Sequence, residues 1–490
     1  MVTRALSIAV ASALLAACTV GPDHVRPTLA VADTFAHAPV DTRDARVEHG
    51  TAAIAAPAPD AAFWTRFDDP LLDTLVSEAL VANHDLRIAL SRVDRARALL
   101  RESRFDALPT VTAQANAQDS RASADQLPGV SRGDRRIESF DAGLVAGWEL
   151  DLFGRMRRGI ESQRAGSRAT EADLAAVQVA VVGDLTRTYF ELRGLQQRLR
   201  VAQANADNQA ETVRLVQVRL DAGRGTEFDA SRARAQLETT RARIPALEAA
   251  VAGAMHRIAV LSGRAPESLL ATLAPATDLP ALPARIQPDT PGELLRRRPD
   301  IAAAEARLHA STARIGVATA DLFPRFTLSG LLGSQALDAG ALFERDSRTG
   351  LVALGIDWSF LDIGRVRARI AASDADASGE LARYEQTVLL ALEETETALV
   401  RYARARVEDG HLERAAGDSA SAARLARVRF DAGASDLLEV LDAERSQLQA
   451  QDAFVDARTR SVTGAVGVYR ALAGGWPTQL PTRVEVAAAR

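Results

Sequence analysis

The feature that most constrains this 490-residue chain is an internal duplication. The phrase RLVQVRLDAG at 214–223 returns as RLARVRFDAG at 424–433, and VANHDLRIALSRVDRARALL near 81–100 matches RRRPDIAAAEARLHASTARI at 296–315. The matched landmarks are Asp85 with Asp300 and Pro109 with Pro324 at a spacing of 215, then Trp148 with Trp358, Gly154 with Gly364, Arg155 with Arg365 and Gly223 with Gly433 at 210. Two copies of one unit therefore form the body, and the second has lost five residues between proline and tryptophan.

The duplication predicts the domain organisation. Each repeat is expected to contain a leading helix, a β-hairpin and a long helical hairpin. The predicted segments are a signal peptide (1–17), an acylated N-terminal tether rich in Ala, Pro and Thr (18–65), repeat 1 (66–272, β-hairpin about 110–152), a Pro-rich linker (273–289), repeat 2 (290–477, β-hairpin about 325–362) and a C-terminal tail (478–490).

The N-terminus has the pattern of a processing signal. MVTR supplies a basic start, ALSIAVASALLAA an apolar stretch too short to span a bilayer as a mature helix, and LAAC a small-residue cleavage site. The sequence LAAC, ending in Cys18, the only cysteine, resembles the lipobox of a bacterial lipoprotein, which implies acylation there. By the same resemblance, Thr19 in place of an Asp implies sorting to the outer membrane. A secretory peptide that happens to end near a free cysteine is the alternative.

Hydrophobic periodicity switches within each repeat. Leu86, Leu90, Val93 and Leu100, and likewise Ile301, Leu308 and Ile315, recur at helical spacing. Past each proline the period becomes two. In repeat 1, TVTAQANAQ (110–118) and SFDAGLVAGWELDLF alternate polar with apolar residues, and in repeat 2 the alternating residues are Phe326 to Ser329 and Val352 to Phe360. Each repeat therefore predicts a two-stranded hairpin.

These strands fit either a half-buried sheet of a soluble protein or a transmembrane barrel. The second strand of each hairpin runs for about a dozen residues, which is enough for a tilted membrane strand. One face is apolar, the other carries acids and glycines, and Trp148, Phe153, Trp358 and Phe360 gather at one end as in an interfacial belt. Four strands cannot close a barrel, so the membrane reading requires oligomerisation, and three chains give twelve strands.

Long uninterrupted helical patterns follow each second strand, over about 160–220 and 365–430. A bundle folding back on itself is the alternative to an extended helical hairpin. After the first 18 residues the sequence shows no run of 18 apolar residues typical of a membrane-spanning helix. The DAG phrases predict helix ends at Gly223 and Gly433, after which Thr226 and Asp436 cap the next helix with an acid three residues on.

Composition argues against several classes of function. The net charge is −5 and acids and bases are interspersed, so neither nucleic acid nor a polybasic membrane patch is indicated. The seven histidines do not form HExxH, and phosphate loops, paired CxxC motifs and GxSxG are missing from the sequence. We therefore expect no enzyme, no cofactor and no metal site.

The chain resembles the TolC-like outer membrane factors, in the lipoprotein branch that includes OprM and NodT-type proteins. CTVGPDHVRP (18–27), FWTRFDDPLLDTLVSEAL (63–80) and RRRPDIAAAEARLHASTARIGVATADLFPRFTLSG (296–330) carry the resemblance. It implies an α+β membrane protein, a homotrimer with a twelve-stranded transmembrane β-barrel continued by a long periplasmic α-helical barrel. It also implies a passive exit duct for small molecules in a tripartite efflux pump, with a periplasmic adaptor (membrane fusion) protein and an inner membrane pump of the resistance-nodulation-division type as partners.

The resemblance also implies functional positions. By analogy with the OprM branch, the motif LEVLDAER predicts a periplasmic gate of Leu438, Asp442 and Arg445, with Asp442 and Leu438 one helical turn apart. The repeat 1 equivalents are Phe228, Arg232 and Ala235, so an acidic ring in a trimer would have three members. The positions expected to contact the adaptor at the hairpin tips are Gly223, Thr226, Phe228, Gly433, Asp436 and Leu438.

Two alternatives to efflux remain open from the sequence. A duct of the same design can serve a type I protein secretion system, and a structural lipoprotein can span the periplasm as a coiled-coil spacer. An exposed ion pair without a gating role is the alternative reading of Asp442 and Arg445. The sequence does not name the cargo, the adaptor or the pump.

Overall fold

The structure is a computed structural model that describes residues 19–37, 62–281, 286 and 290–473. The predicted signal peptide, the lipidation position Cys18 and the predicted tail at 478–490 lie outside the described residues, and these expectations stay predictions. The chain divides into two compact units, described separately below. We call them the strand unit, within residues 1–28, 92–171 and 303–385, and the hairpin unit, within 29–91, 172–302 and 386–490.

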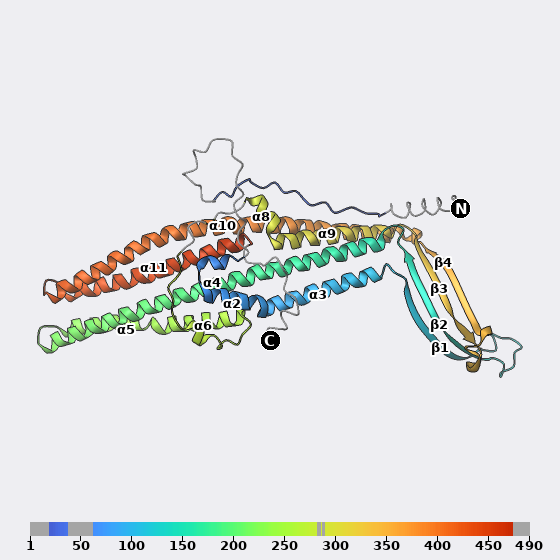
Figure 1. Cartoon of the computed structure of the whole chain (residues 1–490), viewed down its shortest axis with the longest axis horizontal. Coiled ribbons are helices and arrows are strands. Elements are labelled where there is room, and N and C mark those ends of the chain that lie inside the picture. The colour runs from blue at the N-terminus through green and yellow to red at the C-terminus, as the bar shows by residue number, and fades with distance from the viewer. Residues whose placement is uncertain (1–18, 38–61, 282–285, 287–289, 474–490) are drawn as a thin grey trace. The chain divides into compact units, whose positions relative to one another are not determined.

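The order of elements repeats, as the duplication predicts (Figure 1). Repeat 1 contains η1 (Phe63–Phe67), α2 (Pro70–Ala82), α3 (His84–Phe105), β1 (Thr110–Arg121), β2 (Arg136–Leu150), α4 (Arg155–Asp221), α5 (Glu227–Arg241), α6 (Ile244–Leu261) and α7 (Leu270–Leu273). Repeat 2 contains α8 (Pro291–Arg297), α9 (Pro299–Ala320), β3 (Arg325–Ala336), η2 (Ala339–Ala341), η3 (Arg345–Ser347), β4 (Arg348–Asp357), η4 (Phe360–Asp362), α10 (Ile363–Asp431) and α11 (Leu437–Ala471). The leading helix, two strands, long helix and returning helix thus occur twice.

The strand unit contains one antiparallel sheet in the order β1-β2-β3-β4 (Figure 1). The two hairpins join because β2 pairs with β3, with Trp148 opposite Leu328 and Leu144 opposite Leu332. β1 and β3 start 215 residues apart, whereas the tryptophans of β2 and of the segment after β4 are 210 apart. Three of the five missing residues therefore fall in the loop between β3 and β4, and the other two shorten the start of β4.

The register gives the sheet two different faces. Because side chains alternate along a strand and face the same side as their cross-strand partners, each face can be followed over all four strands. The apolar face carries Val111, Ala113, Ala115, Phe140, Ala142, Leu144, Ala146, Trp148, Phe326, Leu328, Leu332, Val352, Leu354 and Ile356. The opposite face is mostly polar, although Val145, Leu331 and Leu351 also lie on it. Its polar residues are Thr110, Thr112, Gln114, Asn116, Ser139, Asp141, Glu149, Thr327, Ser329, Gln335, Thr349 and Asp357. Several apolar side chains are open to solvent, and Val352 is 82% exposed.

The tryptophans occupy matching places in the two repeats. The indole Nε1 of Trp148 donates to the Ala107 carbonyl at 3.0 Å, and that of Trp358 donates to the Leu322 carbonyl at 3.1 Å. Each indole therefore joins the end of a second strand to the turn before the first strand. The strands themselves end at Leu150 and Asp357, slightly before the predicted limits of 152 and 362.

The long helices are present as predicted. α4 has 67 residues and α10 has 69, which at 1.5 Å per residue is about 100 Å each. The returning helices differ between repeats, because α11 is continuous whereas its repeat 1 counterpart is divided into α5 and α6. Pro245 lies in the first turn of α6, where it lacks the N–H that a continuous helix would need, and Val455 occupies the equivalent position of α11.

The predicted tether is too long at its C-terminal end. Residues Phe63–Phe67 form a 3-10 helix whose Phe63, Trp64 and Phe67 are buried, so they belong to the folded hairpin unit. The Phe63 ring stacks on Tyr469 of α11 with centroids 5.0 Å apart. The predicted boundary follows the Ala, Pro and Thr composition of the tether. It does not account for these aromatic residues, which pack on Tyr469 near the other end of the chain.

One helical run passes a looser test for a membrane-spanning helix, although it is not an unbroken run of 18 apolar residues. Among the described residues, Glu227–Leu261 is long and apolar enough, by length and composition alone, to cross a membrane. It is divided between α5 and α6 and contains Glu248, His256 and Arg257. Val251, Met255, Ile258 and Leu261 are buried at helical spacing, which is the pattern of an amphipathic helix packed on its own unit.

Candidate functional site

Both helical hairpins turn on a glycine in the left-handed conformation. Gly223 has φ of 71° and Gly433 has φ of 72°. The Gly223 N–H donates to the Leu220 carbonyl at 2.9 Å and the next N–H donates to the Arg219 carbonyl at 2.8 Å, which is a Schellman motif. The same two bonds recur after α10, at 3.0 and 2.8 Å. The predicted helix ends are confirmed, because only glycine takes this conformation without strain.

The predicted caps are present after both turns. The Thr226 hydroxyl accepts from the Asp229 N–H at 3.2 Å while the Asp229 carboxylate accepts from the Thr226 N–H at 3.3 Å, forming a capping box. The Asp436 carboxylate accepts from the Glu439 N–H at 3.0 Å. The second helix of each hairpin therefore starts at a residue that the local sequence determines.

The two hairpin tips pack on each other within the hairpin unit, although they come from different repeats. A buried apolar cluster joins them, formed by Val216, Ala230, Ala233, Phe430, Leu437, Val440 and Leu441. The Arg219 guanidinium lies 3.8 Å from the centroid of the Phe430 ring and donates to the Phe430 carbonyl at 3.2 Å. The Gln236 amide donates to the Leu441 carbonyl at 3.4 Å. The tips thus form one packed structure, which we call the tip cluster.

The three predicted gate residues lie on an exposed stripe of α11 beside this packing. Leu438 is 47% exposed, and the side chains of Asp442 and Arg445 are 60% and 59% exposed. Arg445 donates to Asp442 in an ion pair within the same helix. Leu438, Asp442 and Arg445 therefore share one exposed face, and they are free of a packing role in the tip cluster.

The repeat 1 counterparts occupy a similar exposed face but differ chemically. Phe228 is 70% exposed, and the Arg232 guanidinium lies 6.0 Å from the centroid of its ring. A cation therefore occupies the repeat 1 position that matches Asp442 in repeat 2. The two hairpins therefore carry side chains of opposite charge at this equivalent position.

A buried acid that the sequence reasoning missed joins the two hairpins. The Thr212 hydroxyl of α4 donates to Glu444 of α11 at 3.0 Å, and Arg427 of α10 donates to the Thr212 hydroxyl at 2.6 Å. Burial raises the pKa of the Glu444 carboxyl, while the Thr212 hydrogen bond and the Arg427 charge act in the opposite direction. Its burial could have been predicted from helical spacing, because Glu444 lies three residues after Leu441 and four before Leu448, which are both buried.

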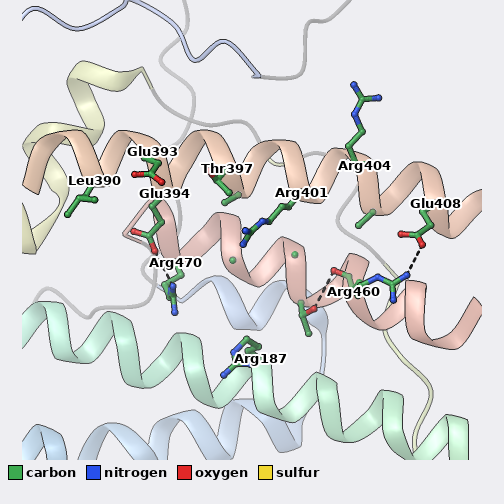
Figure 2. A pocket seen from close by; sticks show the side chains of 15 residues that line it. Arg187, Leu390, Glu393, Glu394, Thr397, Arg401, Arg404, Glu408, Arg460 and Arg470 are labelled. Carbon is green, nitrogen blue, oxygen red and sulfur yellow. Dashed lines mark hydrogen bonds and ion pairs between the residues drawn. The ribbon is translucent and has the colours of Figure 1, made fainter. Parts of the chain in front are cut away.

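A pocket of about 860 Å³ lies in the hairpin unit along α10 and α11 (Figure 2). Its wall is formed by arginines, glutamates and small residues, and several of the charges are paired. Arg460 forms an ion pair with Glu408 at 2.8 Å and Arg470 forms one with Glu394 at 3.1 Å. The pocket thus presents both signs of charge. Within the part of the chain that the structure describes, His, Cys, Asp and Glu side chains form no group of three suited to a metal ion.

Together these features define a class. A sheet with one apolar and one polar face, helices of about 100 Å and paired hairpin tips are typical of an outer membrane channel with a periplasmic helical extension.

Comparisons with known proteins agree with this class. The family model described as "Outer membrane efflux protein" matches residues 75–264 and 290–474. The pyoverdine export outer membrane protein OpmQ of Pseudomonas putida is 33% identical over 437 residues, covering 88% of this chain and 92% of that protein. The toluene efflux pump outer membrane protein TtgI of Pseudomonas putida is 31% identical, covering 84% and 86%. The solved outer-membrane channel OprN is similar with a TM-score of 0.84 and 44% identity, covering 94% of this chain and 100% of that one.

The chain belongs to the outer membrane efflux protein family. It is an outer membrane efflux channel, as the resemblance implied, and the family consists of channels. The predicted fold class is confirmed, with long helices and four strands in each chain. The gate, the adaptor contacts and the lipid anchor stay predictions.

Proposed function

We propose that three copies of this chain form a passive exit duct for small molecules through the outer membrane and the periplasm. The observation that carries the proposal is the open sheet, in which β1 and β4 each pair on one side only among the described residues. An unpaired strand edge in hydrocarbon leaves backbone groups unsatisfied at several kcal/mol each. Joining β4 of one copy to β1 of the next removes every edge, and three copies give a twelve-stranded barrel.

The two faces of the sheet support the same arrangement. Val352, Leu354 and Ile356 are all more than half exposed and suit contact with lipid, whereas the face of Gln114, Asn116 and similar residues suits a water-filled interior. Trp148 and Trp358 lie at one end of their hairpins, where an interfacial aromatic belt would be. The barrel would therefore face lipid with its apolar side and the passage with its polar side.

The gate we propose consists of Leu438, Asp442 and Arg445. They lie on one exposed face near the hairpin tips, and none of them is a member of the buried tip cluster. In a trimer, three Asp442 carboxylates around an axis would repel each other unless Arg445 or ions compensate. The ion pair between Arg445 and Asp442 supplies part of that compensation.

The remaining partners follow from the same assembly. A periplasmic adaptor protein would contact the tips around Gly223, Thr226, Phe228, Gly433, Asp436 and Leu438, and an inner membrane pump of the resistance-nodulation-division type would supply the energy. Acylation of Cys18 would anchor each chain to the outer membrane.

Small-molecule efflux is preferred to protein secretion as the transport activity. The name of one relative describes toluene efflux, and that of another describes pyoverdine export. A pull-down from membranes with the acylated protein as bait separates the two activities. Recovery of a resistance-nodulation-division pump supports efflux, whereas recovery of an ATP-driven protein exporter would support secretion.

Conductance in planar bilayers tests the duct and its gate together. We expect purified wild-type protein to form discrete channels and Asp442→Ala to raise the leakage current. Asp418→Ala is the matched control, because Asp418 is an exposed acid on α10 outside the proposed gate. Unchanged conductance in Asp442→Ala would remove the gate assignment, and absence of any conductance would favour the coiled-coil spacer.

A further inference from the structure

The described residues nearest to the proposed acylation position are packed against the strand unit. The Val20 N–H donates to the Phe153 carbonyl at 3.2 Å. A β-carbon added to Gly21 would lie 2.4 Å from the Cα of Gly316 in α9, and one added to Gly154 would lie 2.7 Å from Thr19. Gly154 therefore leaves just enough room for this backbone to pass, Gly21 allows it to approach α9, and Gly316 leaves room for the Arg158 side chain.

Arg158 of α4 holds the same segment by its charge. Its side chain is only 5% exposed, and its Nη2 donates to the Asp23 carboxylate at 2.6 Å. The guanidinium also donates to the carbonyls of Val20 at 3.2 Å and Gly21 at 3.3 Å. Burying a guanidinium is costly unless it is paired, so the segment supplies partners to Arg158 in addition to the Glu161 carboxylate of the same helix.

Two more side chains of the segment contact α9. The His24 ring stacks on His309 with centroids 4.5 Å apart and planes 9° apart. Glu161 connects this stack to the arginine, since one of its oxygens lies 2.8 Å from His309 Nε2 and the other accepts from Arg158 at 2.9 Å. Arg26 forms an ion pair with Glu305 at 3.1 Å.

We call this set of contacts the N-terminal seat, formed by Gly154, Arg158, Glu161, Glu305, His309 and Gly316. The duplication provides an internal comparison, because every seat residue has a counterpart in the other repeat. The counterparts are Gly364, Ala368, Ala371, Leu90, Asp94 and Arg101 respectively. Five of the six differ in chemical type, and a β-carbon on Gly364 would meet nothing. The residues of the seat therefore occur together only at the place where α4 and α9 contact the N-terminal segment, and the equivalent positions of the other repeat do not reproduce them.

We propose that Thr19–Thr28 is a seated anchor segment and that Arg158 is its positioning residue. The segment immediately follows Cys18, so acyl chains on that cysteine would be held at a fixed place beside the junction of β2 and α4. The membrane anchor and the barrel wall then move as one body, instead of being joined by a loose tether. This inference rests on the proposed lipidation of Cys18.

Spin-label mobility on the full-length lipidated protein tests the seat. Val25 is 79% exposed, so a nitroxide at Val25→Cys reports on the segment without disturbing its contacts, and an acylated Cys18 takes no label. We expect Arg158→Ala to raise the ratio of mobile to immobile label by at least about tenfold, since charge-assisted hydrogen bonds are lost. Arg164→Ala, an exposed arginine on the same helix, is the control and should leave the spectrum unchanged.

A second variant guards against misfolding of the helix. Asp23 is 86% exposed on the segment itself, so Asp23→Ala should release the segment without unfolding α4, and Asp23→Glu should restore the immobile signal. An immobile label in both Arg158→Ala and Asp23→Ala would overturn the proposal. Mass spectrometry of the N-terminal peptide reports acylation separately, so a protein without acyl chains but with an immobile label would refute the lipid anchor and leave the seat standing.

Discussion

Leu438 and Leu441 lie about one turn apart on α11, and substituting each of them tests the proposed gate separately from the packing of the tips. Leu441 is 5% exposed and belongs to the tip cluster, whereas Leu438 is 47% exposed and is not a member of it. Full burial of a leucine side chain is worth about 1.5 to 3 kcal/mol, and removing it from a core adds a cavity cost, for a total of about 2 to 5 kcal/mol. Leu441→Ala should therefore destabilise the tips by about 3 kcal/mol. Leu438→Ala, which loses about half of a burial, should cost about 1 kcal/mol or less.

The two variants should differ in opposite senses in two assays. Hydrogen exchange of peptides covering 437–448 should accelerate strongly in Leu441→Ala and little in Leu438→Ala, because local opening reports the stability of the packed tips. Bilayer conductance should rise in Leu438→Ala, because the proposed constriction is lost. If Leu438→Ala accelerated exchange as much as Leu441→Ala and left conductance unchanged, Leu438 would be a packing residue and the gate assignment would be wrong.

Three further outcomes follow from local geometry. Gly433→Ala should destabilise the second hairpin by about 1 to 2 kcal/mol, because its φ of 72° is strained for alanine. Gly417→Ala inside α10 should stabilise the chain by up to about 1 kcal/mol, because alanine favours a helix more than glycine does and a β-carbon there would meet nothing. The melting temperatures of the two variants should therefore shift in opposite directions. Because burial raises the pKa of Glu444 in the folded chain, tip packing is most stable below the unfolded pKa and weakens as the pH rises through the folded value. Glu444→Gln cannot ionise at this position, so the difference in tip stability between about pH 5 and about pH 8, measured by hydrogen exchange, should disappear in this variant. Burial and then the charge of His309 lower the pKa of His24, so docking of the segment should be complete above about pH 6.5 and weaken as the pH falls through the folded value, as the mobility of the Val25→Cys label should report.

Local structure could be predicted from the sequence where a residue acts on its near neighbours. Gly223 and Gly433 end helices through their own backbone freedom, Thr226 caps the residue three positions on, and strict alternation in 110–118 indicates a strand. The duplication then extended each inference to a second place. The break between α5 and α6 is a local effect of the same kind, because Pro245 lies in the first turn of α6 and lacks the N–H of a continuous helix.

Non-local contacts could not be predicted in the same way. Phe430 meets Arg219, and Arg158 meets Asp23, across separations of 211 and 135 residues, and no periodicity relates such pairs. Glu444 is buried because α4 and α10 supply a hydroxyl and a guanidinium, which a single helix does not reveal. The gate residues lie on an exposed face of one chain, so their relation to a pore depends on the other copies.

The central claim is that one chain has too few strands to close a barrel, so that copies share one wall. Native mass spectrometry of the detergent-extracted full chain tests it most directly, with circular dichroism of the same sample to establish that the protein is folded. We expect a dominant species of three chains. A folded protein that remained strictly monomeric at high concentration would contradict the account.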